Sequence, residues 1–394
     1  MTSNHPSPDF ADLPALASAP DTPTPLLGGL TPQQFMRRYW QKKPLLIRQA
    51  IPGFAPLLGR PELFALAQSP QVESRLIVRQ GDDWSLAQGP FERRQLPPLK
   101  QSAWTLLVQG VDLHHDAVHQ LLQRFRFVPD ARLDDLMISW ASEGGGVGPH
   151  FDSYDVFLLQ ASGRRRWRIG RQQDLSLQPD KPLKILQHFE PEQEWVLEPG
   201  DMLYLPPQWA HDGVALDAGC MTYSVGFRVP QRGALAAELV QRLADECTDE
   251  RLYRDRNQAA TATPAALPEA LYDFARDALK CLLRDKVGLR LALGEVLSEP
   301  KPLVCFSAPE QPWQPGAVAL DRRTRMLYDA EHVFVNGEAW CAGGKDARLL
   351  HELADRRALS AEQVRCASAA VQEQLAEWQQ AGWLHLQPVA LAEG

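Results

Sequence analysis

Several features are scarce in this chain of 394 residues, and each scarcity excludes a class of protein. No apolar stretch reaches the length of about eighteen residues that a membrane-spanning helix needs, so no such helix is predicted. The first residues, MTSNHPSPDFADLP, have no basic stretch followed by an apolar one, so no secretory signal is expected. Positive charge is in deficit, with a formal net charge of −8. Such a chain is a poor general binder of nucleic acid and suits a basic partner better.

Cysteine is sparse and has no pattern. The chain has 6 cysteines with no CxxC pair and no cluster among them. This distribution favours free thiols in the reducing cytoplasm over a disulfide framework or a zinc site. The residues concerned are Cys220, Cys247, Cys281, Cys305, Cys341 and Cys366.

The composition that remains is that of a soluble globular protein with a sizeable core, and the length suggests two or three domains. Residues 1–28 are rich in Pro, Ser, Thr and Asp without periodicity, which predicts a disordered tail. Regular structure is predicted to begin with a short helix. Thr31 can cap it, Pro32 fits its first position, and Gln34 completes a capping box.

Strand signals dominate from about residue 75 to residue 230. Short runs rich in β-branched, aromatic and aliphatic residues are separated there by Gly, Pro, Asn and Asp. One helix is predicted at 112–125. Many short strands at regular spacing predict a barrel or a sandwich. The runs are SRLIVRQ, WTLLVQG, DLMISWAS, YDVFLLQA, RRRWRIG, EWVLEPG, DMLYLPP and MTYSVGFRV.

The pattern changes after Pro230. Residues 231–298 show helical periodicity, with one apolar face formed by Leu271, Phe274, Ala278, Leu279 and Leu282.

Residues 299–394 mix the two kinds of element. A strand turns at an Asn-Gly pair, helices are predicted at 346–357 and 360–382, and a last strand follows. This order predicts a small domain of winged-helix type.

The segment GPHFDSYDV carries a candidate metal site. Alternate side chains of a strand face the same side, so His150 and Asp152 are predicted to point together. His211, in LEPGDMLYLPPQWAHDG, is the best candidate for a third ligand from a neighbouring strand. Two histidines and one carboxylate form the facial triad of non-heme Fe(II) oxygenases, which leaves three coordination positions open. An isolated H-x-D is more often polar surface, but the side-chain-poor GGGVG before it favours a site.

Three arginines open the next strand. If iron binds a bidentate 2-oxo acid, the far carboxylate of that co-substrate needs a partner, and the planar guanidinium fork matches it. Only alternate residues can face the barrel interior, so Arg165 is predicted to point inward with Trp167, while Arg164 and Arg166 are solvated. The alternative is that all three form an ordinary charged edge.

Three segments together resemble the bacterial JmjC-type ribosomal oxygenases. They are FMRRYWQKKPLLIR, MISWASEGGGVGPHFDSYDVFLLQASGRRRWRIG and PGDMLYLPPQWAHDG. The resemblance implies a mixed β and α fold with a double-stranded β-helix (cupin/JmjC) core at 29–230. It also implies a helical dimerisation segment at 231–298 and a winged-helix-like domain at 299–394. The implied cofactor and co-substrates are Fe(II), 2-oxoglutarate and O2.

The resemblance also assigns roles to residues. It places the metal on His150, Asp152 and His211, and the co-substrate carboxylate on Arg165, with Ser139 as a hydroxyl donor. The family has Asn in the last core strand where this chain has Thr222, whose shorter hydroxyl could still donate. The guanidinium of a substrate should meet carboxylates, for which Asp134, Asp135 and Asp155 are the candidates, and the family points to Asp134.

The implied activity is hydroxylation of an arginine side chain in a basic large-subunit ribosomal protein by a cytoplasmic homodimer. Two alternatives remain open. The same site acting on an N-methyl group would make the protein a demethylase. A metal-binding cupin without catalysis could instead regulate nucleic acid through residues 300–394, although no basic recognition helix is evident there and direct nucleic-acid binding is not expected.

Overall fold

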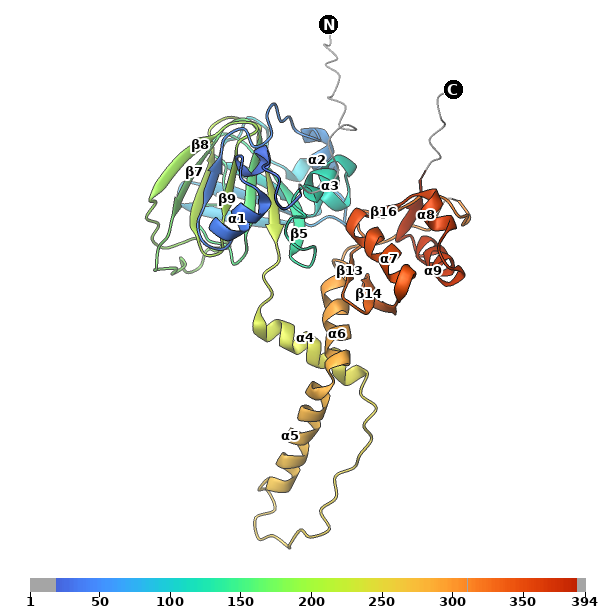
Figure 1. Cartoon of the computed structure of the whole chain (residues 1–394). Helices are drawn as coiled ribbons and strands as arrows, with labels where there is room; N and C mark the ends of the chain where they lie inside the picture. The colour runs from blue at the N-terminus through green and yellow to red at the C-terminus, as the bar shows by residue number, and fades with distance from the viewer. Residues whose placement is uncertain (1–18, 310, 388–394) are drawn as a thin grey trace. The chain divides into compact units, whose positions relative to one another are not determined.

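The computed structural model describes residues 19–309 and 311–387, and this part of the chain divides into two compact units (Figure 1). The first unit ends at Val229 and the second begins at Pro230. None of the helices in the described residues is long and apolar enough to cross a membrane.

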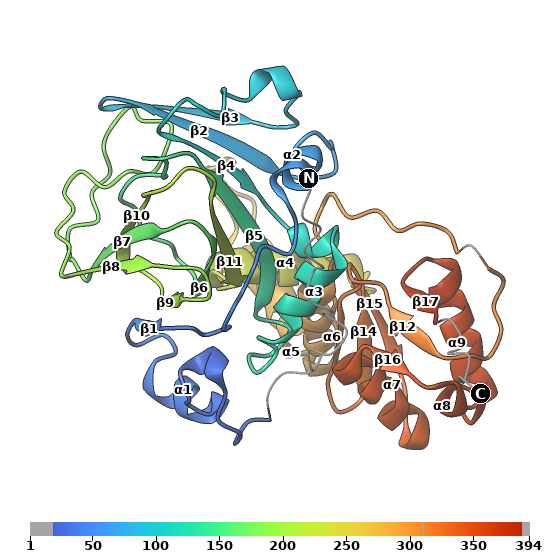
Figure 2. The ribbon, with the colours of Figure 1, turned by 90° about the horizontal axis from the view of Figure 1, so that it is seen from above.

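The first unit is built on two antiparallel sheets that face each other, as the view from above shows (Figure 2). The larger sheet has the strand order β1-β9-β6-β11-β5-β4-β2-β3, and the smaller has the order β10-β7-β8. This is the predicted double-stranded β-helix. The strands are β1 (Leu45–Ile47), β2 (Ser74–Gln80), β3 (Asp83–Gln88), β4 (Trp104–Val108), β5 (Leu133–Ala141), β6 (Val156–Ser162), β7 (Arg165–Gly170), β8 (Gln193–Leu197), β9 (Met202–Leu205), β10 (Ala210–Ala215) and β11 (Cys220–Phe227).

The two faces of the larger sheet differ in polarity, as the residues of β5 show. Leu136, Ile138 and Trp140 are buried in an apolar core on one face of the sheet. Ser139 alternates with them and points to the other face, inside the barrel. Apolar residues thus hold the sheet against the N-terminal helices, while polar residues are left for the interior.

Short helices cover the outer face of the larger sheet. The predicted capping box is present on the first of them, where Thr31 accepts from Gln34 N and Gln34 accepts from Thr31 N, both at 3.1 Å. The helix predicted at 112–125 is shorter and is preceded by a separate turn. The helices are η2 (Pro25–Leu27), α1 (Pro32–Arg38), α2 (Arg60–Leu66), η3 (Arg93–Gln95), η4 (Val111–Leu113) and α3 (Asp116–Gln123).

The last residues of the predicted disordered tail, residues 1–28, have regular structure. Part of it, residues 1–18, lies outside the described residues. Within the rest, Thr24 caps η2, and Leu26 and Leu27 are buried in the apolar core. Ordered structure therefore starts before residue 28, because two leucines in a Pro- and Thr-rich stretch are enough to anchor it.

The second unit combines three helices with a small domain of strands and helices. The helix predicted at 360–382 is two helices, because the chain breaks after Arg365 and Ser368 caps a new one. The elements are α4 (Arg232–Asp245), α5 (Glu269–Arg284), α6 (Lys286–Ser298), β12 (Val318–Leu320), β13 (Met326–Tyr328), β14 (His332–Val335), β15 (Glu338–Cys341), α7 (Gly344–Arg356), β16 (Ala358–Leu359), α8 (Ala361–Arg365), α9 (Ala369–Gln380) and β17 (Leu384–Leu386).

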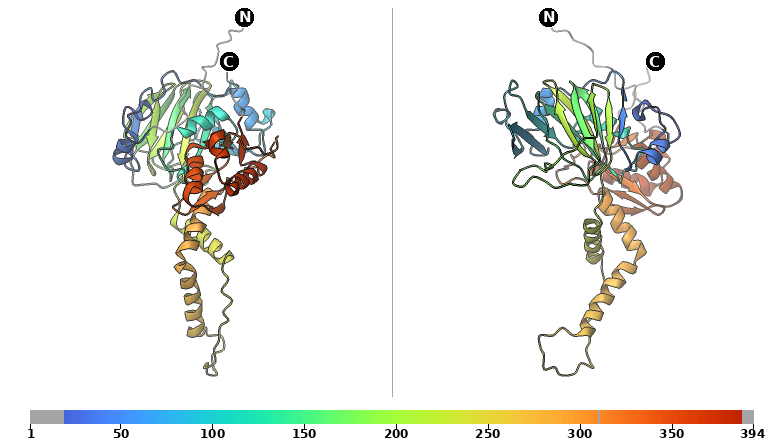
Figure 3. Two further views of the ribbon diagram at one scale, coloured as in Figure 1. Left: turned by 45° about the vertical axis from the view of Figure 1, so that its right-hand side comes forward. Right: turned by 90° about the vertical axis from the view of Figure 1, so that its left-hand side faces the viewer.

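Helix α6 packs against the sheet formed by β13, β14 and β15. Gly294 allows this close approach, because a Cβ there would lie 2.3 Å from ring atoms of Phe334. Helix α5 has a different environment. It has no buried residue, and in Figure 3 no other helix or strand of this unit lies along it. Its predicted apolar face is therefore mostly exposed, although the Tyr253 ring from the preceding loop lies 5.6 Å from the ring of Phe274.

Candidate metal and co-substrate site

The structure brings together all three predicted metal ligands. His150 and His211 form a single antiparallel bridge, in which each N–H donates to the other's carbonyl at 2.9 and 2.8 Å. Their ring centroids are 4.2 Å apart. The Asp152 carboxylate lies 3.6 Å from His211 Nε2. One ligand atom from each residue lies within 4.8 Å of the others, which is the spacing that a single ion requires.

The route to this convergence differs from the prediction. His150 and Asp152 are not on a regular strand, because β6 begins only at Val156. Asp152 lies in a loop that is fixed where its carbonyl accepts from Gln208 N at 2.7 Å. His211 lies on β10, a strand that is not among those predicted from the sequence. The triad is thus formed by a cross-strand bridge and not by alternation along one strand.

Both histidines have their Nε2 atoms available for a metal. His150 Nδ1 is 2.9 Å from Gly148 O, and His211 Nδ1 is 2.9 Å from Trp209 O. A carbonyl only accepts, so each Nδ1 carries the proton and each Nε2 keeps its lone pair. Burial and the neighbouring His150 lower the pKa of His211 to about 4, against the opposing effect of Asp152. The donor set therefore fits a divalent metal of intermediate softness such as Fe(II).

Arg165 points into the barrel, as predicted. Its side chain is buried, and among the described residues neither Nε nor Nη2 has a hydrogen-bond partner. Arg164, by contrast, forms an exposed ion pair with Asp217 at 3.0 Å. A buried guanidinium without an anion is strongly unfavourable, so the interior requires a negatively charged occupant. The far carboxylate of 2-oxoglutarate meets this requirement.

A row of polar side chains crosses the inner face of the larger sheet. Ser139 lies opposite Thr222 on β11, and Thr222 lies opposite Gln160 on β6. Thr222 Oγ1 donates to Gln160 Oε1 at 3.0 Å, and the Gln160 amide donates to the carbonyls of Ser162 at 2.8 Å and Gly163 at 3.1 Å. Gln160 was not among the predicted site residues. Its signal in the sequence is a single polar residue inside the apolar run VFLLQA.

The three acidic candidates have different environments. Asp155 is fully buried and accepts from Tyr204 Oη at 2.6 Å and from Gln41 Nε2 at 3.0 Å. Asp155 is therefore poorly placed to meet a substrate, because buried groups of the protein already surround its carboxylate. Asp134 is partly exposed and pairs with Arg228 at 3.2 Å.

Asp135 lies on the same face of β5 as Ser139, which is the inner face of the sheet. Its carboxylate is buried and accepts from Gly110 N at 3.0 Å. Burial and the nearby carboxylates of Asp152 and Asp135 raise the pKa of the Tyr154 phenol. Asp135 and Asp152 therefore both lie near Tyr154, on the metal side of the sheet.

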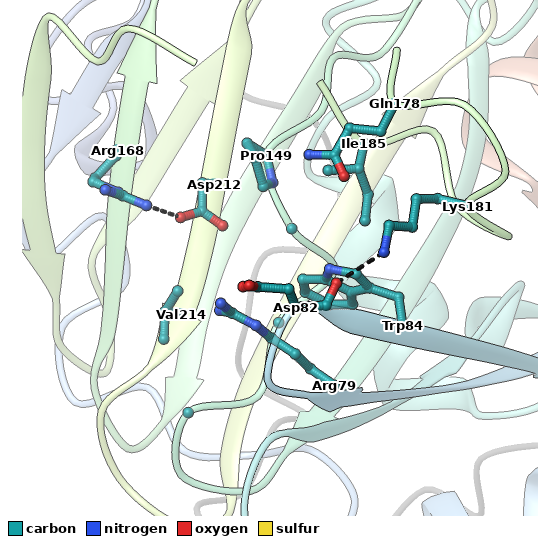
Figure 4. A pocket seen from close by; sticks show the side chains of 13 residues that line it. Arg79, Asp82, Trp84, Pro149, Arg168, Gln178, Lys181, Ile185, Asp212 and Val214 are labelled. Carbon is teal, nitrogen blue, oxygen red and sulfur yellow. Dashed lines mark hydrogen bonds and ion pairs between the residues drawn. The ribbon is translucent and has the colours of Figure 1, made fainter. Parts of the chain in front are cut away.

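A cavity of about 370 Å³ adjoins the ligand-bearing segments (Figure 4). Pro149 and Asp212, the sequence neighbours of His150 and His211, line it together with the tip of the β2–β3 hairpin and residues 178–185. One ion pair joins two of its charged lining residues, in which Arg168 donates to Asp212 at 2.6 Å. Lys181 donates to the backbone carbonyl of Asp82 at 3.0 Å.

The comparisons with known proteins agree with this geometry. Residues 120–235 match the JmjC domain family, and residues 282–385 match the ROXA-like winged helix. The chain is 36% identical over 344 residues to the ribosomal protein uL16 3-hydroxylase of Escherichia coli, covering 83% of this chain and 90% of that protein. The chain belongs to the JmjC-type ribosomal oxygenases.

Solved structures extend the likeness within this family. The ribosomal oxygenase YcfD from Escherichia coli, in complex with cobalt and 2-oxoglutarate, matches with a TM-score of 0.77 at 33% identity, covering 90% of this chain and 98% of that one. A more distant relative is a bifunctional lysine-specific demethylase and histidyl-hydroxylase of Drosophila persimilis. It is 24% identical over 200 residues, which are 48% of this chain and 29% of that protein.

The predicted enzyme class is confirmed. The chain is a 2-oxoglutarate-dependent dioxygenase of this family, with Fe(II) as its metal and O2 as its second co-substrate. The predicted architecture of a cupin-type core followed by a winged-helix domain is confirmed as well.

Proposed function

We propose that this ribosomal oxygenase hydroxylates an arginine side chain of a large-subunit ribosomal protein. The observation that carries the proposal is the convergence of His150, Asp152 and His211 in the same barrel as the buried Arg165, whose Nε and Nη2 have no partner in the part of the chain that the structure describes. The likeness to a uL16 3-hydroxylase over 90% of that protein supports this substrate class. The acidic net charge of −8 also suits a basic substrate.

Each part of the reaction has a candidate group in the barrel. His150, Asp152 and His211 would hold Fe(II), and Arg165 would hold the far carboxylate of 2-oxoglutarate. With both bound, the site converts a C–H bond to C–OH while 2-oxoglutarate and O2 become succinate and CO2. The protein orients the reactants on rigid strands and excludes water from them.

Ser139 is proposed as a hydroxyl donor to the co-substrate, because it lies on the inner face of β5 without a strong partner of its own. Within residues 19–309 and 311–387 its side chain makes one hydrogen bond, a long one of 3.4 Å from Oγ to Thr222 O. Thr222 is less suited to this role, since its single hydroxyl proton is already donated to Gln160. We assign Thr222 to the support of Gln160 and leave the carboxylate to Ser139 and Arg165.

For the substrate guanidinium we propose Asp135 as the inward-facing carboxylate and Asp134 as the more exposed one. Asp135 shares its face of β5 with Ser139, which supports a place inside the barrel. A charge-assisted bond of this kind would contribute about 1.5–3 kcal/mol to substrate binding.

The helical segment is proposed as a homodimer interface. Leu271, Phe274 and Leu279 lie along α5 and are 38%, 37% and 56% exposed, although their spacing gives one apolar face. A second copy of the chain would cover this face. A ribosomal substrate would place the dimer in the cytoplasm.

The test is an intact-mass comparison of ribosomal proteins before and after incubation with the enzyme, Fe(II), O2 and 2-oxoglutarate. Hydroxylation adds one oxygen atom to one protein, and tandem mass spectrometry should place it on an arginine. Loss of a methylene group from a methylated protein would instead support the demethylase alternative. The name of the Drosophila relative includes such an activity. Tight DNA binding without 2-oxoglutarate turnover would support the regulator, which is disfavoured because α9 contains no Lys or Arg.

A further inference from the structure

The indole of Trp167 is a buried donor without a partner. Its side chain is 5% exposed, and Nε1 has no hydrogen-bond partner among the described residues. A buried indole N–H is normally satisfied, because an unmade bond costs its full desolvation. The described residues supply no acceptor here, so the surroundings of the indole decide whether a bound molecule supplies one.

Trp167 lies between the metal ligands and Arg165. Across the β7–β10 pairing, Ile169 is opposite His211, Trp167 is opposite Gly213, and Arg165 is opposite Ala215. The Trp167 ring centroid is 5.9 Å from that of His211, and Arg165 Cζ is 5.8 Å from the Trp167 ring. A co-substrate that reaches from the metal to Arg165 must therefore pass alongside the indole.

Packing fixes the direction of this indole. A Cβ on Gly213 would lie 2.6 Å from both Cη2 and Cζ3 of Trp167, so the six-membered ring occupies the space that glycine leaves free. Nε1 is on the opposite side of the ring system from Cζ3. The N–H is therefore directed away from Gly213 and is held there by a rigid contact.

We propose that Trp167 is a binding residue for 2-oxoglutarate. Its ring lies beside the methylene carbons of the co-substrate, and Nε1–H donates a hydrogen bond to a carboxylate oxygen. The same carboxylate then accepts hydrogen bonds from Arg165, whose Nε and Nη2 also have no partner within the described residues. This inference rests on the proposed co-substrate site. Arg165 selects a negatively charged group, and the neutral indole N–H adds a hydrogen bond that also selects the position of that group.

Trp104 provides a matched control. Its Nε1 is also buried and has no partner in the described part of the chain, and its side chain is fully buried. It lies, however, in the apolar core on the outer face of the larger sheet, among residues such as Phe64 and Trp140. An unpaired indole N–H alone is thus not the argument. What distinguishes Trp167 is its place between His211 and Arg165.

The test compares W167F and W104F with the unaltered full-length protein. Phenylalanine keeps an aromatic ring but removes the N–H. Calorimetry with the Co(II)-loaded protein should show that W167F binds 2-oxoglutarate about tenfold more weakly, the size expected for one bond to a charged acceptor. Co(II) affinity should stay within about twofold in both variants, and W104F should bind 2-oxoglutarate like the unaltered protein.

A second measurement does not depend on the stability of a variant. In the Zn(II)-loaded protein with ¹⁵N-labelled tryptophan, the Trp167 indole N–H resonance is identified through its contacts with the His211 ring. It should move downfield when 2-oxoglutarate is added. Unchanged affinity in W167F, or a resonance that does not move while 2-oxoglutarate binds, would overturn the role of Trp167. Failure of the unaltered protein to bind 2-oxoglutarate would instead refute the co-substrate site as a whole.

Discussion

Thr222 donates its hydroxyl proton to Gln160 at 3.0 Å, and Gln160 in turn holds the turn that leads into β7 through the carbonyls of Ser162 and Gly163. This turn places Arg165 at the start of β7. The Thr222–Gln160 pair therefore stabilises the turn that precedes β7, and Thr222 has no proton left for a carboxylate.

Replacing Thr222 by Val should lower stability and leave co-substrate binding almost unchanged. The substitution leaves Gln160 Oε1 buried without a donor, which costs about 1–3 kcal/mol. Denaturant unfolding should show this loss of stability in T222V. T222S keeps a hydroxyl donor for Gln160 and should retain most of the stability of the unaltered protein. A large rise in the Kd for 2-oxoglutarate in T222V, with stability unchanged, would show that Thr222 contacts the co-substrate after all.

Asp152→Ala should abolish turnover. Two histidines without the carboxylate hold Fe(II) poorly, since the facial triad needs its anionic member. Metal titration should show weaker binding by at least about tenfold, together with loss of 2-oxoglutarate consumption. D217N is a suitable control, because Asp217 pairs with Arg164 on the surface. Full activity in D152A would refute the metal assignment.

Arg165→Ala should raise the KM for 2-oxoglutarate far more than the KM for the polypeptide substrate. The expected loss is about 2–3 kcal/mol of binding free energy, or a factor of roughly 30–150. R164A, which removes an exposed guanidinium from the same triplet, should change neither value by more than about twofold. Equal effects of R165A on the two substrates would contradict a specific contact with the co-substrate.

Leu279→Asp should dissociate the proposed dimer. Leu279 is 56% exposed on the apolar face of α5, and a buried carboxylate in an interface is strongly unfavourable. Light scattering after size exclusion should report a molar mass near that of one chain, 44.1 kDa. K280E alters the opposite face of the same helix and should stay dimeric. A monomeric unaltered protein would refute the interface.

The second unit should lose stability in acid through Asp321. Burial opposes its ionisation, but hydrogen bonds from Arg323 at 2.7 Å and from His385 at 2.8 Å hold the pKa of Asp321 below its usual value. A lowered carboxyl pKa stabilises the fold above the pKa of the unfolded chain, about 4, and this contribution is lost as the pH falls through the lower folded value.

The measurement is urea unfolding of the winged-helix domain at pH 7 and pH 3, followed by tryptophan fluorescence. D321N should be destabilised by about 3 kcal/mol at pH 7 and should differ less from the unaltered protein at pH 3. D277N, on the exposed surface of α5, should behave like the unaltered protein. A constant difference between D321N and the unaltered protein at both pH values would contradict the role of the Asp321 carboxylate.

Local sequence determined much of this molecule. The capping box at Thr31, the alternation that places Arg165 inward, and the apolar face of α5 all follow from residues close together in the chain. Their physics is local, because helix caps and strand alternation depend on neighbours within a few positions. His150, Asp152 and His211 could be recognised as candidate ligands from the sequence, because the ability of a side chain to bind a metal depends on its residue type.

Tertiary structure decided how these residues meet. The His150–His211 bridge joins segments far apart in the chain, and no local pattern shows that β10 begins at Ala210. The burial of Asp155 against Tyr204 and Gln41 depends on a strand and a loop distant from it, so its exclusion from the substrate site could not be predicted. Pairing between distant strands is a long-range contact, and only the folded barrel makes it.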